Sequence, residues 1–256
     1  MKAGICGALG RMGTAITGVL ASRGHEVVAA FDSLKPSAGN VLQTSEINLA
    51  AIEKCTVLLD FSAPAATAEL LPLAIKAAKP IVIGTTGFTQ EQKEQIESAA
   101  KNIPVLFSPN MAVGVNILFK LTQIAAAAMD GSFDVEIMEI HHRHKKDAPS
   151  GTAKRLAQIV KENMSGMEDA KIISSRDGII GERSQKEIGV MALRGGDTVG
   201  DHTVYFISEG ERIELSIRST DRNTLAKGAV LAAEYLEDKK PGLYSMFDVL
   251  RLNNDR

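Results

Sequence analysis

The stretch Ala3-Gly4-Ile5-Cys6-Gly7-Ala8-Leu9-Gly10-Arg11-Met12-Gly13 joins a short apolar run, a glycine-rich turn and the start of a helical pattern. Such a turn lets the backbone approach a pyrophosphate without a Cβ in the way. The helix behind it offers free N–H groups and the positive end of its dipole. The spacing is G-x-x-G-x-x-G rather than G-x-G-x-x-G, and a glycine-rich turn without a ligand would look the same. We predict a strand over 3–6 and a helix over 12–23.

A second β-rich run, 26–31, is followed directly by Asp32. In a dinucleotide site, an acidic side chain at the end of this strand accepts hydrogen bonds from the adenosine ribose hydroxyls. An ordinary carboxylate at a strand end is the alternative. Because strand, glycines, helix and acid follow one another in the required order, the pattern favours dinucleotide binding.

The alternation of strand and helix continues to about residue 111. Apolar runs at 57–61, 80–84 and 103–107 alternate with helical patterns at 65–78 and 89–101. This order predicts βαβ units and an α/β fold with a Rossmann-type, doubly wound parallel sheet. The loops Gly84-Thr85-Thr86 and Ser108-Pro109-Asn110-Met111 follow predicted strands, at the edge where such sheets bind ligands, although tight turns would look the same.

Beyond about residue 112 the pattern changes. Helical patterns at 118–129, 152–161 and 224–236 accompany β-like runs, several of them separated by glycine-rich turns, at 133–140, 171–174, 185–193, 203–208 and 212–219. Spacing of this kind favours a second α/β domain with an antiparallel or mixed sheet.

Composition narrows the class of protein. The chain has 256 residues, a net charge of −2 and 45% hydrophobic residues, which fits one large or two modest domains and argues against a general nucleic-acid binder. Two cysteines, Cys6 and Cys55, form neither a disulfide framework nor a zinc ligand set. Charged residues interrupt every apolar run before it could span a bilayer, so we expect a cytoplasmic protein that uses no membrane.

The segment His141-His142-Arg143-His144-Lys145-Lys146 concentrates positive charge and imidazole groups. Adjacent histidines on an extended chain point in opposite directions and no recognisable ligand set surrounds them, so we expect no metal. A solvated basic loop is the simplest alternative. However, Pro149-Ser150-Gly151-Thr152 follows and opens a helix, where small residues expose N–H donors to an anion. The segment therefore predicts a pocket for a polyanionic small molecule, with histidine available for proton transfer.

The segment from Glu139 to Thr152 closely resembles the signature of the dihydrodipicolinate reductase family, whose members act in lysine and diaminopimelate biosynthesis. The resemblance extends over nearly the whole chain and in family order, through the following landmarks: 7–13, Asp60-Phe61-Ser62, 84–88, 110–116, Arg194-Gly195-Gly196-Asp197 through His202-Thr203, and 247–250. It implies an enzyme that transfers a hydride from NADH or NADPH to a cyclic dicarboxylate imine, 4-hydroxy-tetrahydrodipicolinate.

The resemblance also implies a domain organisation. Residues 1–112 with 222–256 would form the dinucleotide-binding domain, because in the family the C-terminal helix returns to it. Residues 113–221 would form the domain for substrate binding and tetramerisation. The expected assembly is a homotetramer.

Residue roles follow from the same resemblance. His141 would donate the proton, and Lys145 would be a second donor and charge partner. Substrate carboxylate would be bound by His142, Ser150, Gly151 and Thr152. The cofactor would be held by Gly7, Ala8, Leu9, Gly10, Arg11, Met12, Asp32, Gly84, Thr85, Thr86, Ser108, Pro109, Asn110 and Met111.

One position departs from the family pattern. Many members carry a basic residue directly after the acid on the second strand, where it meets a 2′-phosphate, but this chain has Ser33 there and Lys35 two residues on. We therefore expect NADH to be preferred, or to be used at least as well as NADPH.

Two alternatives stay open from the sequence. A semialdehyde dehydrogenase would need a cysteine nucleophile near the nicotinamide, and neither Cys6 nor Cys55 is well placed for that. A non-catalytic dinucleotide-sensing protein would not need the basic histidine segment beside a helix start.

Overall fold

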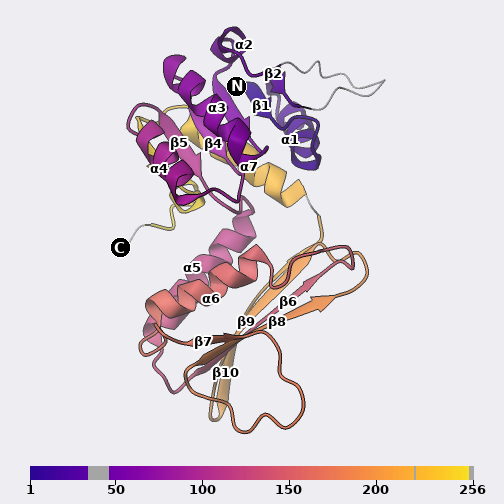
Figure 1. Cartoon of the computed structure of the whole chain (residues 1–256), viewed down its shortest axis with the longest axis vertical. Coiled ribbons are helices and arrows are strands. Elements are labelled where there is room, and N and C mark those ends of the chain that lie inside the picture. The colour runs from indigo at the N-terminus through magenta and orange to yellow at the C-terminus, as the bar shows by residue number, and fades with distance from the viewer. Residues whose placement is uncertain (34–45, 222, 254–256) are drawn as a thin grey trace. The chain divides into compact units, whose positions relative to one another are not determined.

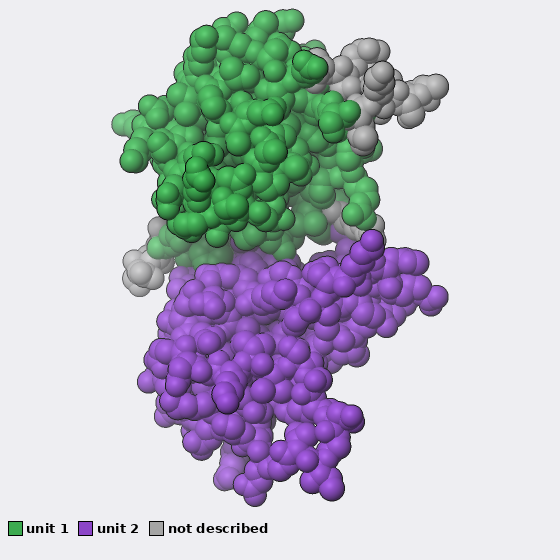
Figure 2. All heavy atoms as spheres, in the orientation of Figure 1, with its two compact units in different colours: residues 1–113, 223–256 green, residues 114–222 purple. Residues whose placement is uncertain are grey.

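The computed structural model describes residues 1–33, 46–221 and 223–253. The chain forms two compact units, coloured separately in Figure 2. Unit 1 comprises Met1–Val113 and Asn223–Arg256, and unit 2 comprises Gly114–Arg222. Unit 1 is therefore built from both ends of the chain, and unit 2 is the continuous segment between them.

Unit 1 contains a six-stranded parallel sheet. Its strands are β1 (Lys2–Cys6), β2 (Glu26–Phe31), β3 (Val57–Asp60), β4 (Ile81–Ile83), β5 (Pro104–Phe107) and β11 (Gly242–Tyr244). Their order in the sheet is β11-β5-β4-β3-β1-β2 (Figure 1). Every residue of β3 and β4 is buried, as expected for central strands that are covered on both faces.

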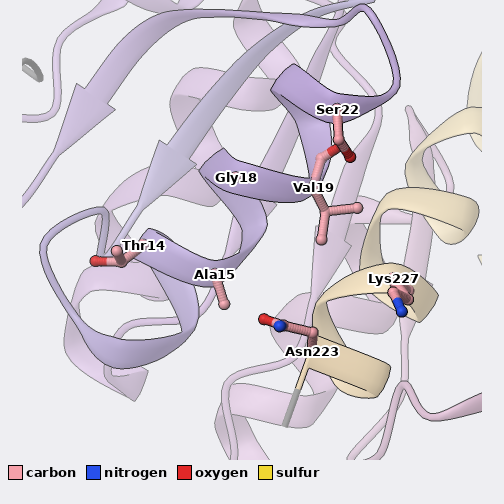
Figure 3. Close-up of a pocket in the computed structure, with 7 residues that line it drawn as sticks. All are labelled: Thr14, Ala15, Gly18, Val19, Ser22, Asn223 and Lys227. Atoms are coloured by element: carbon pink, nitrogen blue, oxygen red, sulfur yellow. The ribbon is translucent and has the colours of Figure 1, made fainter. Parts of the chain in front are cut away.

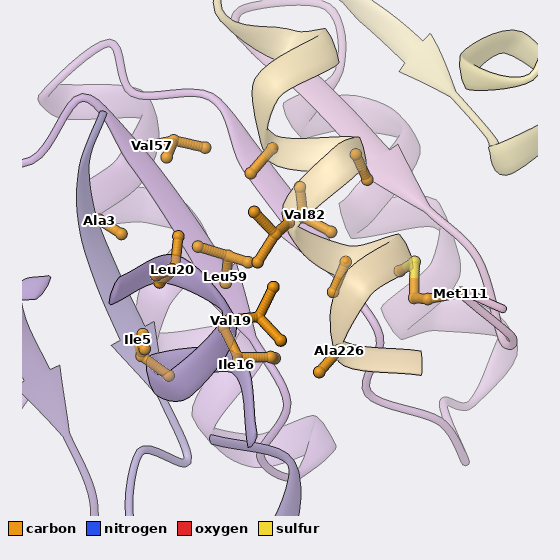
Figure 4. Close-up of a cluster of buried hydrophobic side chains, with 14 of the residues drawn as sticks. Ala3, Ile5, Ile16, Val19, Leu20, Val57, Leu59, Val82, Met111 and Ala226 are labelled. Carbon is orange, nitrogen blue, oxygen red and sulfur yellow. The ribbon is translucent and has the colours of Figure 1, made fainter. Parts of the chain in front are cut away.

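Helices cover both faces of this sheet. They are α1 (Arg11–Ser22), α2 (Leu49–Glu53), α3 (Pro64–Lys76), α4 (Gln90–Ala99), α7 (Asn223–Leu236) and α8 (Met246–Val249). One apolar cluster joins α1 and α7 to the sheet through side chains such as Ile16 and Ala226 (Figure 4). The other joins α2, α3 and α4 to the opposite face through Ile52, Leu70 and Ile96. The predicted doubly wound α/β fold is confirmed.

The topology of the sheet determines where a ligand can bind. From β1 the chain crosses to β2 on one side and then returns to β3 on the other. The strand order therefore reverses at β1, and the carboxyl end of β1 is the switch point where open α/β sheets bind ligands. The glycine-rich turn that begins at Gly7 directly follows this end.

Unit 2 contains a five-stranded mixed sheet. Its strands are β6 (Asp134–His141), β7 (Lys171–Ile173), β8 (Glu187–Arg194), β9 (Gly200–Ser208) and β10 (Glu211–Ser219), in the order β10-β9-β6-β8-β7. Strand β6 pairs parallel with β8 and antiparallel with β9. Helix α6 (Gly151–Asn163) packs against β6, β8 and β9, and α5 (Val113–Ala128) precedes the sheet. The predicted mixed second sheet is confirmed.

Some elements differ from the sequence predictions. Helix α5 begins at Val113 rather than near Leu118, because valine and glycine have low helix propensity and hid its first turn. The short elements α2, β11 and α8 were not predicted, since three to five residues carry too little periodicity. Among the described helices, none combines the length and the apolarity required to cross a bilayer.

Candidate active site

The glycine-rich turn after β1 is shaped by close backbone approaches. Gly7 has a φ of +79°, and a Cβ there would lie 2.4 Å from the carbonyl oxygen of Phe61. A Cβ at Gly13 would lie 2.2 Å from the carbonyl oxygen of Gly7. Gly10 caps α1 without a side-chain hydrogen bond to the first turn. The glycines therefore let the turn pack closely, and the first N–H groups of α1 have no side-chain cap, which fits a pyrophosphate.

Asp32 lies beside this turn. Its Oδ2 accepts a hydrogen bond of 2.8 Å from the backbone N–H of Leu9, so the carboxylate is fixed next to the loop. Ser33 follows and is exposed. Lys35, which the sequence analysis considered as a phosphate partner, lies outside the described residues. The position of Asp32 fits a carboxylate that receives ribose hydroxyls.

A buried carboxylate supports the loop after β4. Asp60 is fully buried and accepts hydrogen bonds from the hydroxyls of Ser62 and Thr67, each 2.5 Å long, and of Thr85, 3.1 Å long. The pKa of Asp60 is raised, because the effect of burial exceeds the lowering effect of these hydroxyl hydrogen bonds. The Thr85 hydroxyl also accepts from the Ser62 backbone N–H at 2.9 Å. Thr85 thus fixes the loop, while Thr86 is exposed beside it.

The loop after β5 is held by its own side chains. Ser108 Oγ donates to the carbonyl of Asn110 at 2.8 Å, and Asn110 Oδ1 accepts from the Ala112 N–H at 2.9 Å. Met111 is buried in the core cluster of unit 1, and its carbonyl approaches α7 so closely that a Cβ at Gly228 would lie 1.8 Å from it. The side chain of Met111 is therefore a core residue, and any contact with a ligand falls to the backbone of this loop.

In unit 2, three strands and one helix bring polar side chains together. Buried and half-buried residues alternate along β6, and this places Glu139 and His141 on the buried face. His202 on β9 lies opposite Glu139, and Arg194 at the end of β8 lies opposite His141. Ser150 adds the N-cap of α6. We call these five residues the His141 cluster.

Glu139 is the centre of the His141 cluster and is fully buried. Arg194 donates to both of its oxygens at 2.8 Å, the Ser150 N–H donates to Oε1 at 3.0 Å, and His141 Nδ1 lies 2.5 Å from Oε2. Burial alone would raise the pKa of Glu139, but the hydrogen bonds from Arg194, His141 and Ser150 outweigh it and lower the pKa. The carboxylate is therefore ionised at neutral pH and can only accept, so Nδ1 of His141 carries a proton.

His202 completes the cluster as a neutral ring. Its Nε2 lies 3.0 Å from Ser150 Oγ, and its ring meets that of His141 edge to face with centroids 5.1 Å apart. Its pKa is lowered to about 4, chiefly by burial and then by His141. Its Nδ1 is buried and has no hydrogen-bond partner among the residues that the structure describes.

The turn after β6 carries the other predicted residues. The backbone N–H of His142 donates to the carbonyl of Thr198 at 2.8 Å, and Lys145 Nζ lies 2.9 Å from Asp147 Oδ1. Ser150 Oγ accepts from the Ala153 N–H and caps α6, and Gly151 is exposed in the first turn. A Cβ at Gly151 would meet no atom within 4 Å, so the helix start opens onto free space.

The structure thus places the predicted residues in two groups. The cofactor residues surround the carboxyl edge of the sheet in unit 1, and the predicted catalytic and substrate residues lie on β6, α6 and the turn between them in unit 2. The sequence alone indicated no role for Glu139, Arg194 or His202. The sequence did carry a signal for the placement of Glu139. Every second residue of a strand lies on the same face, and this places Glu139 on the buried face of β6 with Val135, Ile137 and His141.

A pocket lies on the surface of unit 1, away from the predicted site residues. It has a volume of about 380 Å³ and lies between α1 and α7 (Figure 3), lined by Thr14, Ala15, Gly18, Val19, Ser22, Asn223 and Lys227. None of the predicted site residues lines it. It is therefore separate from both groups.

Neither cysteine has the chemistry of a nucleophile. Burial raises the pKa of Cys6 to about 12 and that of Cys55 to about 11. A thiolate is required for attack on an aldehyde, and both groups are thiols at neutral pH. These values disfavour the semialdehyde dehydrogenase alternative.

Known proteins match this chain over both of its units. The family models described as "Dihydrodipicolinate reductase, N-terminus" and "Dihydrodipicolinate reductase, C-terminus" match residues 1–111 and 114–250. The chain is 50% identical to a 4-hydroxy-tetrahydrodipicolinate reductase of Aquifex aeolicus, over 97% of this chain and 98% of that protein. It is 45% identical to one of Methanococcus maripaludis, over 99% of this chain and 100% of that protein.

A solved structure agrees with these relatives. The dipicolinate-bound dihydrodipicolinate reductase of Paenisporosarcina sp. TG-14 superimposes with a TM-score of 0.78 at 27% identity, covering 97% of this chain and 98% of that one. The sequence matches and the shared fold extend over both units. The chain therefore belongs to the dihydrodipicolinate reductase family.

Proposed function

We propose that this protein reduces 4-hydroxy-tetrahydrodipicolinate to tetrahydrodipicolinate with NAD(P)H, and that the His141 cluster delivers the proton. The observation that carries this proposal is the placement of a hydrogen-bonded histidine beside the open N-terminus of α6. A dicarboxylate needs oriented N–H groups and cations, and an electron-rich product of hydride addition needs an acid. Both are present on neighbouring elements of unit 2.

The residues of unit 1 fit a nicotinamide dinucleotide. The turn at 7–13 would hold the pyrophosphate, Asp32 the adenosine ribose, and the loops after β4 and β5 the nicotinamide end. When bound, NAD(P)H supplies the hydride. The hydrogen bonds of Asp60 and Asn110 fix these loops in advance, so little order has to be gained on binding.

Substrate binding falls to the start of α6 and the basic turn before it. The N–H groups of Gly151 and Thr152 would receive one carboxylate, helped by the helix dipole. His142 and Lys145 would balance the remaining negative charge. Lys145 is paired with Asp147 at 2.9 Å in the structure, so binding would exchange that partner for the substrate.

Proton delivery is assigned to His141. Loss of the 4-hydroxyl group together with a hydrogen of the neighbouring ring carbon, as water, gives a conjugated imine. Hydride addition to the carbon that carried the hydroxyl group then leaves an enamine. The neighbouring ring carbon then takes up a proton. Because Nδ1 of His141 is held by Glu139, the remaining nitrogen, Nε2, would give its proton to that carbon, with Lys145 as a second donor.

We further propose that NADH is preferred, or used at least as well as NADPH. A 2′-phosphate brings about two negative charges against Asp32, and Ser33 offers no positive charge to balance them. The ratio of kcat/KM for the two cofactors, measured at low and at physiological salt, tests this. Ser33→Arg should shift the ratio toward NADPH because a guanidinium pairs with phosphate, whereas a strong NADPH preference of the wild type at both salts would contradict the proposal.

A homotetramer is the proposed assembly. The alternation along β6 and β9 places Met138, Ile140, Tyr205 and Ile207 on the face of the sheet away from the His141 cluster, and Leu193 on β8 is exposed. Apolar side chains on a sheet face favour burial against another chain. Sedimentation velocity should give the mass of four chains of 27.3 kDa, and a monomer at micromolar concentration would contradict it.

The activity itself is tested by absorbance. The purified protein should oxidise NADH when the cyclic imine is present and leave it unchanged when the imine is absent. Tetrahydrodipicolinate should form in equal amount. Oxidation that does not depend on the imine, or no oxidation with either cofactor, would overturn the proposed function.

A further inference from the structure

We propose that Glu139 is a positioning residue for His141: its carboxylate accepts the Nδ1–H of the ring and stabilises the doubly protonated ring, so that Nε2 carries the proton given to the substrate. This proposal rests on the proposed function of His141. Glu139 lies on the same face of β6 as His141 and would act on the reaction only through the His141 side chain. Glu139 itself has no exposed surface and cannot touch the substrate.

The geometry around His141 leaves one orientation. Nδ1 is 2.5 Å from Glu139 Oε2, and the ring of His202 on β9 packs nearly perpendicular to the His141 ring. On the Nε2 side lies Gly200, where a Cβ would be 2.9 Å from that nitrogen. Because Gly200 has no side chain, the His141 ring fits in this orientation. The side chain of His141 is 11% exposed.

Glu139 is itself fixed by partners that do not depend on His141. Arg194 donates to both carboxylate oxygens at 2.8 Å, and it also donates to the carbonyl of Asp147 at 2.7 Å. The Ser150 N–H holds Oε1 at 3.0 Å, directly before the helix start that would bind substrate. The same carboxylate thus ties the orientation of His141 to the position of the α6 N-terminus. An ionised, rigid acceptor fixes the orientation of a histidine ring and stabilises its doubly protonated form.

Strand β6 provides a matched control. Glu136 is also paired with arginines, receiving hydrogen bonds of 2.9 and 2.8 Å from Arg176 and 3.0 Å from Arg183, but it points to the other face of the sheet. Glu136→Gln removes a carboxylate with the same kind of partners from the same strand. It leaves the contacts of His141 unchanged.

The experiment compares wild type, Glu139→Gln, Glu136→Gln and His141→Gln. A glutamine side chain is neutral, so it no longer stabilises the doubly protonated ring that donates from Nε2. Glu139→Gln should therefore lower kcat at least about tenfold, with KM for the imine and the Kd of NADH within about twofold of wild type. Glu136→Gln should keep kcat. Circular dichroism and the Tm of each variant report on folding.

Proton NMR gives a readout that a structural role would not move. A short hydrogen bond from an imidazole to a carboxylate shifts its proton far downfield, so wild type and Glu136→Gln should show a downfield resonance that His141→Gln and Glu139→Gln lack. A folded Glu139→Gln that keeps kcat and the resonance overturns the proposal. If Glu139→Gln does not fold, the test compares wild type with His141→Gln. A downfield resonance that is present in wild type and absent from His141→Gln supports the proposal. A wild-type spectrum that lacks this resonance overturns the proposal. A fully active His141→Gln would instead refute the proposed role of His141.

Discussion

At the scale of single residues, Gly200 limits where the His141 ring can lie. A Cβ at this position would be 2.9 Å from Nε2 and 3.4 Å from Cδ2, so Gly200→Ala forces the ring to move. A shift of about 1 Å in a reacting group can reduce a rate about 10²-fold, and we expect kcat to fall by at least about tenfold. Steady-state kinetics measure this.

Gly131→Ala is the control for that substitution. Gly131 also lies in unit 2, and a Cβ there would meet no atom within 4 Å. It should leave kcat and stability nearly unchanged. Equal kcat values for the two alanine variants would show that Gly200 has no bearing on His141.

His202 predicts a pH dependence of stability. Its pKa is lowered to about 4, chiefly by burial and then by His141 and Lys145, against a raising effect of Glu139. Histidine in an unfolded chain has a pKa of about 6.5, so as the pH falls below that value the unfolded chain binds the proton first. The contribution of His202 to stability is therefore complete above about pH 6.5 and is lost as the pH falls toward about 4.

Urea unfolding at about pH 7 and about pH 5 tests this dependence. The slope for one proton is up to about tenfold per pH unit in the folding equilibrium constant. His202→Gln cannot titrate, and its amide can still reach Ser150, so its free energy of unfolding should fall less between the two pH values than that of wild type. The same fall in both proteins would assign the dependence to other groups.

At the scale of elements, the start of α6 is the proposed carboxylate site. Gly151 is exposed and a Cβ there meets open space, so a larger side chain should be accepted by the fold but should cover the N–H groups. Gly151→Leu should raise KM for the imine at least about tenfold and leave the Kd of NADH unchanged. Kinetics and calorimetric titration measure the two quantities, and loss of NADH binding instead would mean that the two ligand sites are assigned the wrong way round.

The long regular elements of the chain could be predicted from its sequence. The apolar runs of β3, β4 and β5 and the strand-turn-helix pattern around Gly7 predict the parallel sheet, because central strands are covered on both faces. The three-residue strand β11 could not be predicted, since it exists only by pairing with β5. Local pattern carries no information about such a distant partner.

The site was predictable to a smaller extent. His141 and Ser150 stand out because of their residue types and the helix start that follows them. Arg194 and His202 come from other strands, and their contacts with Glu139 and Ser150 depend on the register of β6 with β8 and β9. Nor did the sequence indicate that the side chain of Met111 would lie in the core beneath α7.

At the scale of the whole molecule, the two groups of predicted residues belong to different units. The residues proposed for the cofactor lie in unit 1, and those proposed for substrate and proton transfer lie in unit 2. Hydride transfer requires the nicotinamide and the imine in contact, so turnover depends on both units. Cofactor binding alone should depend only on unit 1, and this difference makes the two roles separable by experiment.

The most direct test of this division is one comparison of His141→Gln with wild type, in which kcat is measured with the imine and NADH and the Kd of NADH is measured by titration. Loss of a general acid costs about 10²- to 10⁴-fold in rate, so kcat should fall within that range. The Kd of NADH should stay the same because its proposed site lies in unit 1. Near wild-type turnover, or a loss of NADH binding that accounts for the lower rate, would contradict the account.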